Sequence, residues 1–482
     1  MIAATPGSAA APRQTGNAAR KADEMRTFLK VLGFVAGFAT VPALVQAETL
    51  ADALASAYKS SNLLDQNQAV LRAADEDAAI AMANLRPVLN FVSRGSWRQF
   101  DQDIASLGFD NSSTSASVEM TAQVVLWAGG RGKLSLEAAR AQVLSTRAAL
   151  VNVEQQVLLQ AVAAFVNVQL QQEIVALRQS NLRVITQELR AAQDRFEVGE
   201  VTQTDVSLAE AALAASNANL AAAQGQLMVA RERYKAVTGQ YPGKLATLPK
   251  LPAIPKTLDE AKAVAERGHP LVIQAQHQVT AADLNVKIAA TAFGPTLSGS
   301  VDLSKDMESG IASTGLGLQL SQTLSAGGRN AASYRRAIAG KEAAQSGLLQ
   351  SVVQVSETVG QAWSQLLVAQ ASIEAGRQQV TASQRAFDGV REEAKLGART
   401  TLDVLNAEQD LLSARASRLE AEANRYVGVY QVLASMGLLT ADHLNLGVPT
   451  FDPESYYDAV KSAPAHSAQG KALDRILKTI GN

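Results

Sequence analysis

Four short segments of this chain alternate between apolar and polar residues with a period of two. Two lie in each half of the sequence, one after a proline (Pro87 or Pro295) and one before a Gly-Gly pair. Such alternation is typical of β-strands with one apolar and one polar face, so the pattern predicts two β-hairpins. The apolar positions are Leu89, Phe91 and Trp97, then Val118, Met120, Ala122, Val124 and Leu126, then Leu297, Val301 and Leu303, and finally Leu316, Leu318, Leu320 and Leu324.

Most of the remaining sequence can form very long helices. Proline is absent from residues 88–241 and 296–448, and a proline inside a helix costs about 3 kcal/mol. Residues 133–198 contain neither glycine nor proline, and a helix of that length would extend roughly 100 Å. Such long helices persist by packing as coiled coils. The matching run, residues 330–396, contains five glycines, which predicts a bent or less stable helix.

Each long run is interrupted once, and the interruption predicts a tight helical hairpin. Val198-Gly199-Glu200 interrupts the first run, and Leu396-Gly397-Ala398 interrupts the second. Glycine commonly follows the last residue of a helix, so each long helix should end at its glycine. A shorter helix then returns to Gly239 or Gly437. The pairs Thr202 with Asp205 and Thr400 with Asp403 have the spacing of capping boxes that would start these shorter helices.

The two halves are copies of one layout. Thr49–Pro87 recurs as Thr257–Pro295, and Ala128–Arg131 recurs as Ala326–Arg329. The segments Thr49–Asn84 and Thr257–Phe293 are predicted to be helical. A duplication of this length makes two structurally equivalent halves. The predicted divisions are residues 48–241 for the first repeat, 242–256 for a proline-rich linker, 257–440 for the second repeat and 441–482 for a C-terminal segment.

The first 47 residues have the features of an export signal. Arg26 and Lys30 precede an apolar run, residues 31–44, and Val45-Gln46-Ala47 offers small residues to a signal peptidase. We expect cleavage after Ala47 and a start codon at Met25. No later segment is expected to reach the roughly 20 apolar residues of a membrane-spanning helix.

Composition excludes several classes of function. The net charge is −1, so the chain has no electrostatic footprint for nucleic acid. Cysteine is absent and the four histidines are scattered, which leaves no thiol chemistry and no metal-ligand spacing. We expect no metal, no cofactor and no enzymatic activity.

Four amphipathic strands cannot span a bilayer alone. An open sheet would leave its edge hydrogen-bonding groups unsatisfied in hydrocarbon, and bacterial barrels start at about eight strands. Several chains should therefore share one barrel. A soluble amphipathic sheet fits any single strand equally well, but four such strands in an exported chain favour the membrane.

The ordered set of elements resembles the TolC-type outer membrane factor family, over nearly all of the mature chain. The resemblance is carried by Leu126–Arg131 and Leu324–Arg329 after the strands, and by Arg195–Glu200 and Leu396–Ala407 at the hairpin tips. It implies a mixed α/β membrane protein built from two internal repeats. Three chains would share a 12-stranded β-barrel, four strands from each chain, continued by a long α-helical coiled-coil barrel.

The resemblance also implies a function and partners. A homotrimer in the outer membrane, surrounded by lipid, would form a passive exit duct with its helical barrel in the periplasm. It would dock to a periplasmic adaptor protein and through it to an inner-membrane pump of the ABC or RND type. Residues 437–453 look like the branch that serves type I secretion. The linker and the C-terminal segment would form an equatorial belt at mid-height.

Five residues near the tips match the gate of the resembled family. Asp403 falls on an aspartate that rings the aperture, and Asn406 stands where a second acid is found. Arg399 matches an arginine that would bind Thr204 and Asp205 of a neighbouring chain. The tyrosine that assists this latch is replaced by Ala394. Plain helix capping is the alternative role for Asp205 and Asp403. The tips Val198–Glu200 and Leu396–Ala398 are expected to bind the adaptor.

A function of another class is the alternative. A structural periplasmic coiled coil that tethers the layers of the envelope would explain the long helices and the export signal. It does not explain the four alternating strands.

Overall fold

The computed structural model describes residues 47–99, 112–462 and 475. The predicted signal region, apart from Ala47, lies outside the described residues, as do residues 100–111.

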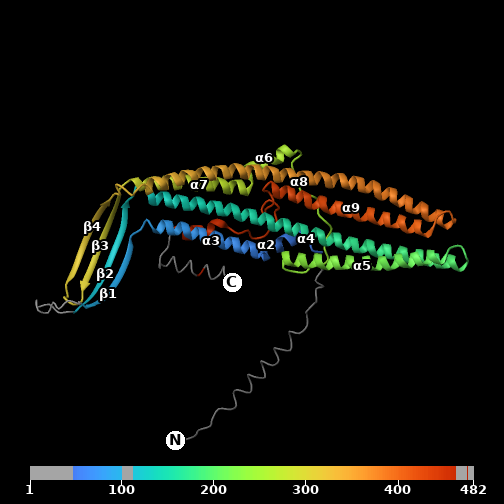
Figure 1. Ribbon diagram of the computed structural model, residues 1–482, viewed down its shortest axis with the longest axis horizontal. Helices are drawn as coiled ribbons and strands as arrows, with labels where there is room; N and C mark the ends of the chain where they lie inside the picture. Colours follow the sequence, from blue (N-terminus) through green and yellow to red (C-terminus); the bar gives the residue numbers. More distant parts are fainter. Residues whose placement is uncertain (1–46, 100–111, 463–474, 476–482) are drawn as a thin grey trace, which may run out of the picture. The chain divides into compact units, whose positions relative to one another are not determined.

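The described residues form helices and a single sheet (Figure 1). The helices are α2 (Leu50–Ser60), α3 (Asn62–Ala83), α4 (Arg131–Glu197), α5 (Gln203–Thr238), α6 (Leu258–Gly268), α7 (Pro270–Ala290), the 3₁₀ turn η2 (Thr291–Phe293), α8 (Arg329–Lys395), α9 (Thr401–Ser435) and α10 (Pro453–Val460). The strands are β1 (Val88–Gln99), β2 (Ser112–Trp127), β3 (Thr296–Asp306) and β4 (Ala312–Ser321).

The second half of the chain repeats the first, as the duplication predicts. Each half has two short helices, a strand pair, a helix of 67 residues and a returning helix of 36 or 35 residues. Each segment predicted to be helical before the strands is broken into two helices. Ser61 is extended and its hydroxyl accepts a hydrogen bond from Leu64 N. His269 precedes Pro270, and a residue before proline is disfavoured in a helix.

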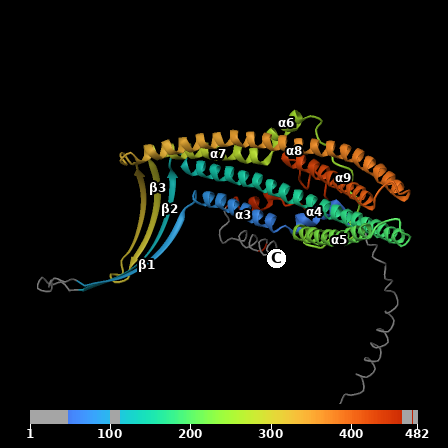
Figure 2. The ribbon, with the colours of Figure 1, turned by 45° about the vertical axis from the view of Figure 1, so that its right-hand side comes forward.

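The four strands form one antiparallel sheet in chain order, β1-β2-β3-β4 (Figures 1 and 2). Its register keeps the predicted apolar positions of the strands on one face: Phe91 lies opposite Met120, Met120 opposite Leu303, and Val301 opposite Leu316. The other face is mostly polar. The expectation for Leu324 was wrong, because β4 ends at Ser321 and Leu324 lies in the following turn.

The long helices pair as two hairpins, α4 with α5 and α8 with α9. The largest core lies where both hairpins meet α2 and α6, and its fully buried side chains include Phe165, Tyr234 and Leu433. The predicted bend or weakness of α8 is not seen as a break, since α8 is continuous over its 67 residues. A Cβ at Gly376 would lie 3.5 Å from Arg418 Cβ, an ordinary packing distance, so Gly376 faces α9.

The expectation that no later segment is apolar enough to span a membrane was too strict. Helix α4 contains an 18-residue stretch with the length and composition of a membrane span. Half of that stretch is buried by the chain's own helices. The same helix contributes Leu158, Val162 and Phe165 to the largest core.

Candidate functional site at the hairpin tips

Both hairpin tips have the same backbone geometry. Gly199 and Gly397 have φ of 81° and 79°, a region that side-chain-bearing residues rarely adopt. Glu200 N donates to Arg195 O and Ala398 N donates to Glu393 O, each at 2.9 Å, which completes a Schellman motif. Val198 and Leu396, beside the glycines, are 71% and 85% exposed. The tips therefore present a rigid turn with an apolar side chain facing solvent.

A capping box begins the helix that follows each tip, as predicted. Asp205 Oδ2 accepts hydrogen bonds from Thr202 N and Oγ1 at 3.0 and 2.7 Å. Asp403 Oδ2 accepts from Thr400 N and Oγ1 at 3.0 and 2.8 Å. The Thr202 hydroxyl chiefly lowers the pKa of Asp205, and the Thr400 amide chiefly lowers the pKa of Asp403. Both carboxylates are therefore charged at neutral pH, and capping is their role within one chain.

Arg399 has a partner in its own chain. Its Nε lies 2.8 Å from Glu393 Oε2, and both side chains are about half exposed. This ion pair raises the pKa of Arg399. Thr204 and Asn406 are exposed on the starts of α5 and α9. The contact of Arg399 with Thr204 and Asp205 joins two different chains, and it stays a prediction.

A buried polar contact between the two hairpins was missed by the sequence analysis. Asn181 Nδ2 on α4 donates to Glu408 Oε1 on α9 at 2.9 Å, and Ser216 Oγ on α5 donates to Asn181 Oδ1 at 3.1 Å. All three residues are buried. The signal was present in the sequence, because Glu408 interrupts the apolar stripe that continues from Val404 to Leu411 along α9.

Two further contacts hold the hairpins together near the tips. Arg391 Nε on α8 lies 3.0 Å from Glu188 Oε1 on α4. Phe387, Ala394, Val404 and Leu411 form a small buried cluster against Val184 of α4. Ala394 thus packs between the hairpins at the position where the resembled family has its latch tyrosine. Within one chain, this polar and apolar layer sets how α9 lies on α4.

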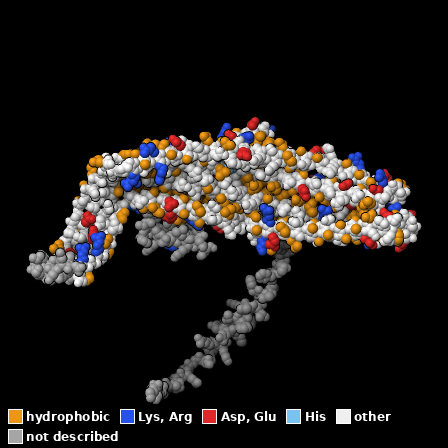
Figure 3. Space-filling model, in the orientation of Figure 1, with side chains coloured by type: hydrophobic (Ala, Val, Ile, Leu, Met, Phe, Trp, Pro, Cys, Tyr) orange, Lys and Arg blue, Asp and Glu red, His pale blue; other side chains and the backbone are white. Residues whose placement is uncertain are grey.

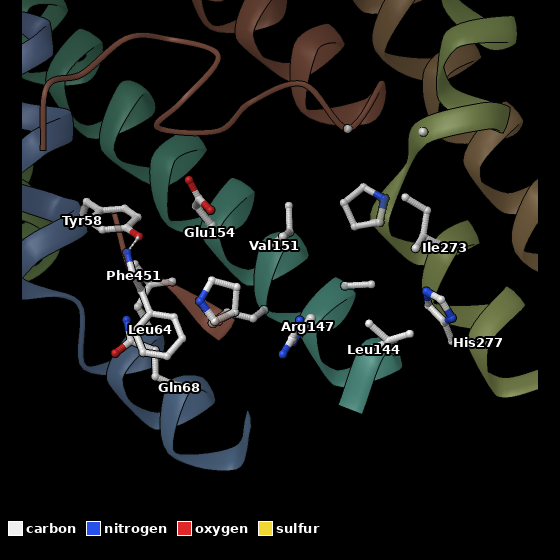
Figure 4. A pocket seen from close by; sticks show the side chains of 16 residues that line it. Tyr58, Leu64, Gln68, Leu144, Arg147, Val151, Glu154, Ile273, His277 and Phe451 are labelled. Carbon is white, nitrogen blue, oxygen red and sulfur yellow. Dashed lines mark hydrogen bonds between the residues drawn. The ribbon is translucent and has the colours of Figure 1, made fainter. Parts of the chain in front are cut away.

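A separate cavity lies beside the C-terminal segment. It has a volume of about 350 Å³ and is lined by residues of α2, α3, α4 and α7 and by Phe451 (Figure 4). Phe451 N donates to Tyr58 Oη at 3.3 Å, and Ala441 N donates to Glu154 Oε1 at 2.7 Å. Burial raises the pKa of Glu154. These contacts attach residues 441–453 to α2 and α4.

We predict that removing the Glu408 side chain loosens the hairpin tips. Burial raises the pKa of Glu408, so the contribution of this carboxyl group to stability falls as pH rises through the raised pKa. Glu408→Ala leaves Asn181 Nδ2 without its acceptor, at a cost of roughly 1–3 kcal/mol. Glu408→Gln keeps an acceptor and removes the buried charge. Hydrogen exchange of residues 401–412 at neutral pH should therefore accelerate in Glu408→Ala but not in Glu408→Gln.

Glu420→Ala is the matched control, because Glu420 is an exposed acid on the same helix. Equal exchange in all three variants would contradict a role for the buried contact.

Comparison with known proteins agrees with this architecture. A family model described as outer membrane efflux protein matches residues 53–240 and 264–438. The chain is 36% identical over 427 residues to the outer membrane efflux protein BepC of Brucella suis, covering 86% of this chain and 91% of BepC. It is 25% identical over 425 residues to the outer membrane protein TolC of Escherichia coli, covering 83% and 84% of the two chains.

The fold is also that of solved channels. A crystal structure of CusC superposes with a TM-score of 0.73 at 20% identity, covering 81% of this chain and 92% of that one. The expected fold class, with strands continued by long helical hairpins in two repeats, is thereby confirmed. The chain belongs to the outer membrane efflux protein family, whose members are channels of the outer membrane.

Proposed function

We propose that this chain is the outer-membrane exit duct of a tripartite type I secretion or efflux system. In this proposal three copies form a passive channel that crosses the outer membrane and the periplasm. The tips dock to a periplasmic adaptor, and an inner-membrane ABC or RND pump supplies the energy and selects the substrate.

The observation that carries the proposal is a sheet with two unpaired edges and one apolar face. Within the described residues, β1 and β4 each pair with only one strand. The apolar face exposes large side chains, among them Phe91, Leu316 and Leu318. Edges in hydrocarbon must be paired, and further copies of the same sheet supply matching edges. A closed barrel of three sheets pairs every edge strand and turns the apolar face to the lipid.

The opposite face of the sheet suits a water-filled lumen. Arg94 Nη1 lies 3.4 Å from Glu119 Oε2, and hydroxyl groups pair across the strands at Ser96 with Ser115. Thr121 lies opposite Asp302 on the same face. Charged and hydroxyl side chains stay hydrated inside a barrel, as the interior of channel-forming barrels requires.

The helices also retain apolar surface that this chain does not cover. Leu349, Val353 and Val368 on α8 are 58–69% exposed, as are Met228 and Val229 on α5 at 63%. Figure 3 shows hydrophobic side chains along the visible face of the helical part. Neighbouring copies in a helical barrel would bury such faces, which supports a homotrimer.

We also propose that charged residues at the tips close the periplasmic end of the duct. Three copies of Asp403 would approach one axis, where like charges repel unless cations or neighbouring groups compensate. Arg399, four residues earlier, would hold a neighbouring tip through Thr204 and Asp205. Asn406 would face the same aperture as a neutral group.

A periplasmic tether is disfavoured by the sheet and by the family. A coiled coil that joins envelope layers does not need an apolar-faced sheet with open edges. The relatives are outer membrane channels rather than tethers.

The first prediction concerns assembly. Native mass spectrometry of the detergent-extracted protein should give the mass of three chains, because four strands cannot close a barrel. A stable monomer extracted from the membrane would refute the duct.

The second prediction separates gating from capping at Asp403. Asp403→Asn keeps an acceptor for Thr400 N and removes the charge, so it should reduce cation selectivity in planar bilayers. Asp205→Asn is the matched control at the other capping box and should change selectivity less. Arg399→Ala should raise single-channel conductance, because it releases the contact between tips. Unchanged conductance and selectivity would remove both residues from the gate.

The third prediction concerns adaptor docking. Gly199→Pro and Gly397→Pro should abolish export and leave the trimer mass intact. Proline cannot adopt the positive φ of these glycines and lacks the N–H that each donates at the helix end. Gly389→Ala, inside α8 with open space around it, is the control. Normal export in both proline variants would place the adaptor contact elsewhere.

A further inference from the structure

A groove lies where the strands of the first repeat meet the helices. It has a volume of about 660 Å³ and is bounded by the end of α3, the end of β2 and the start of α4. Its lining includes Leu85, Leu126, Trp127, Arg131 and Lys133. β2 is an inner strand, paired on both sides, so the groove does not lie at an edge where another copy would add its strand.

A β-bulge turns the aromatic end of the groove toward the apolar face of the sheet. Val125 pairs with Ser298 and Trp127 pairs with Leu297, so Leu126 is the extra residue. Leu297 belongs to the apolar face, and its pairing brings Trp127 onto that face. A Cβ at Gly299 would lie 3.4 Å from Leu126 Cδ1 and 3.6 Å from Leu318 Cδ2. The groove is thus continuous with the lipid-facing side of the sheet.

The basic end of the groove is formed by two cations. Arg131 and Lys133 are exposed, and within the described residues neither side chain has an ion-pair or hydrogen-bond partner. The first turn of α4 contains no acidic residue. Figure 3 shows Lys and Arg side chains beside the junction of strands and helices. Tryptophan with neighbouring cations is the combination found at membrane–water interfaces.

The base of the groove is apolar and closely packed. A Cβ at Gly132 would lie 2.4 Å from Leu85 Cδ2, so the backbone between the two cations packs directly on the end of α3. This packing fixes the positions of Arg131 and Lys133 relative to Leu85.

The second repeat lacks this combination. Ser325 and Ala331 stand 198 residues after Trp127 and Lys133, at the equivalent positions, and only Arg329 retains its charge. Both repeats have the same fold where the strands meet the helices. Only the first repeat has the tryptophan together with both cations. This difference indicates a role for the groove beyond the fold.

We propose that this groove binds the phosphate headgroup of an anionic glycerophospholipid from the periplasm-facing leaflet of the outer membrane. Arg131 and Lys133 bind the phosphate, Trp127 lies at the glycerol level, and Leu126 contacts the start of an acyl chain. One lipid binds per chain. The inference rests on the outer-membrane location of the family and does not require export activity.

The test is native mass spectrometry of the detergent-extracted protein with added phosphatidylglycerol. The wild type should retain one lipid per chain. Arg131→Gln with Lys133→Gln should weaken retention about 25-fold, since each cation near an anionic lipid surface contributes about a factor of five. Trp127→Ser, which installs the residue of the second repeat, should also weaken it.

Arg335→Gln with Arg336→Gln is the matched control, because these exposed cations lie about two turns into α8 and do not line the groove. Equal weakening by the control pair would mean diffuse attraction to basic residues and would overturn the site. Absence of retained lipid in the wild type would overturn it too. Millimolar inorganic phosphate should not displace the lipid, and displacement would show a free-anion site instead. The chain count in the same spectra tests the trimer separately.

Discussion

The unpaired edges of one amphipathic sheet constrain the rest of this structure. Four strands place apolar side chains on one face and hydroxyl and charged groups on the other. Such a sheet can lie in a membrane only if its edge N–H and C=O groups are paired. Pairing with further copies encloses the polar face as a lumen. The helices of 67 residues that follow β2 and β4 must then continue the same ring.

In the proposed duct the long helices lie outside the membrane. Each of them must therefore bury one apolar face along its whole length. Within the chain this is met by the core around Phe165 and Tyr234 and, near the tips, by the smaller cluster with Val404. The buried contact of Asn181 with Glu408 lies in that second layer. A buried hydrogen-bonded pair restricts the alternative packings of the helices around it, which suits a place where the hairpins must keep one arrangement.

Features set by neighbouring residues could be predicted from the sequence. The tips at Gly199 and Gly397 and the capping boxes at Asp205 and Asp403 depend on residues within about six positions, and the period of two gave the correct faces of the sheet. The break at Ser61 was missed because a serine cap is a weak local signal. Glu408 was missed because its partner Asn181 is 227 residues away. The gate and the docking surfaces involve other chains, so no local pattern determines them.

Disulfide trapping between edge strands tests the shared barrel most directly, because the natural chain has no cysteine. Phe91→Cys on β1 would be combined in turn with cysteine at Thr314, Leu316, Leu318 and Leu320 on β4, all on the apolar face. Disulfides form only when the two Cα atoms lie within about 7 Å. The account predicts covalent trimers on non-reducing gels for at least one pair and none for Phe91→Cys alone. Monomers for all four pairs, with every thiol reactive to a small reagent, would contradict the shared barrel.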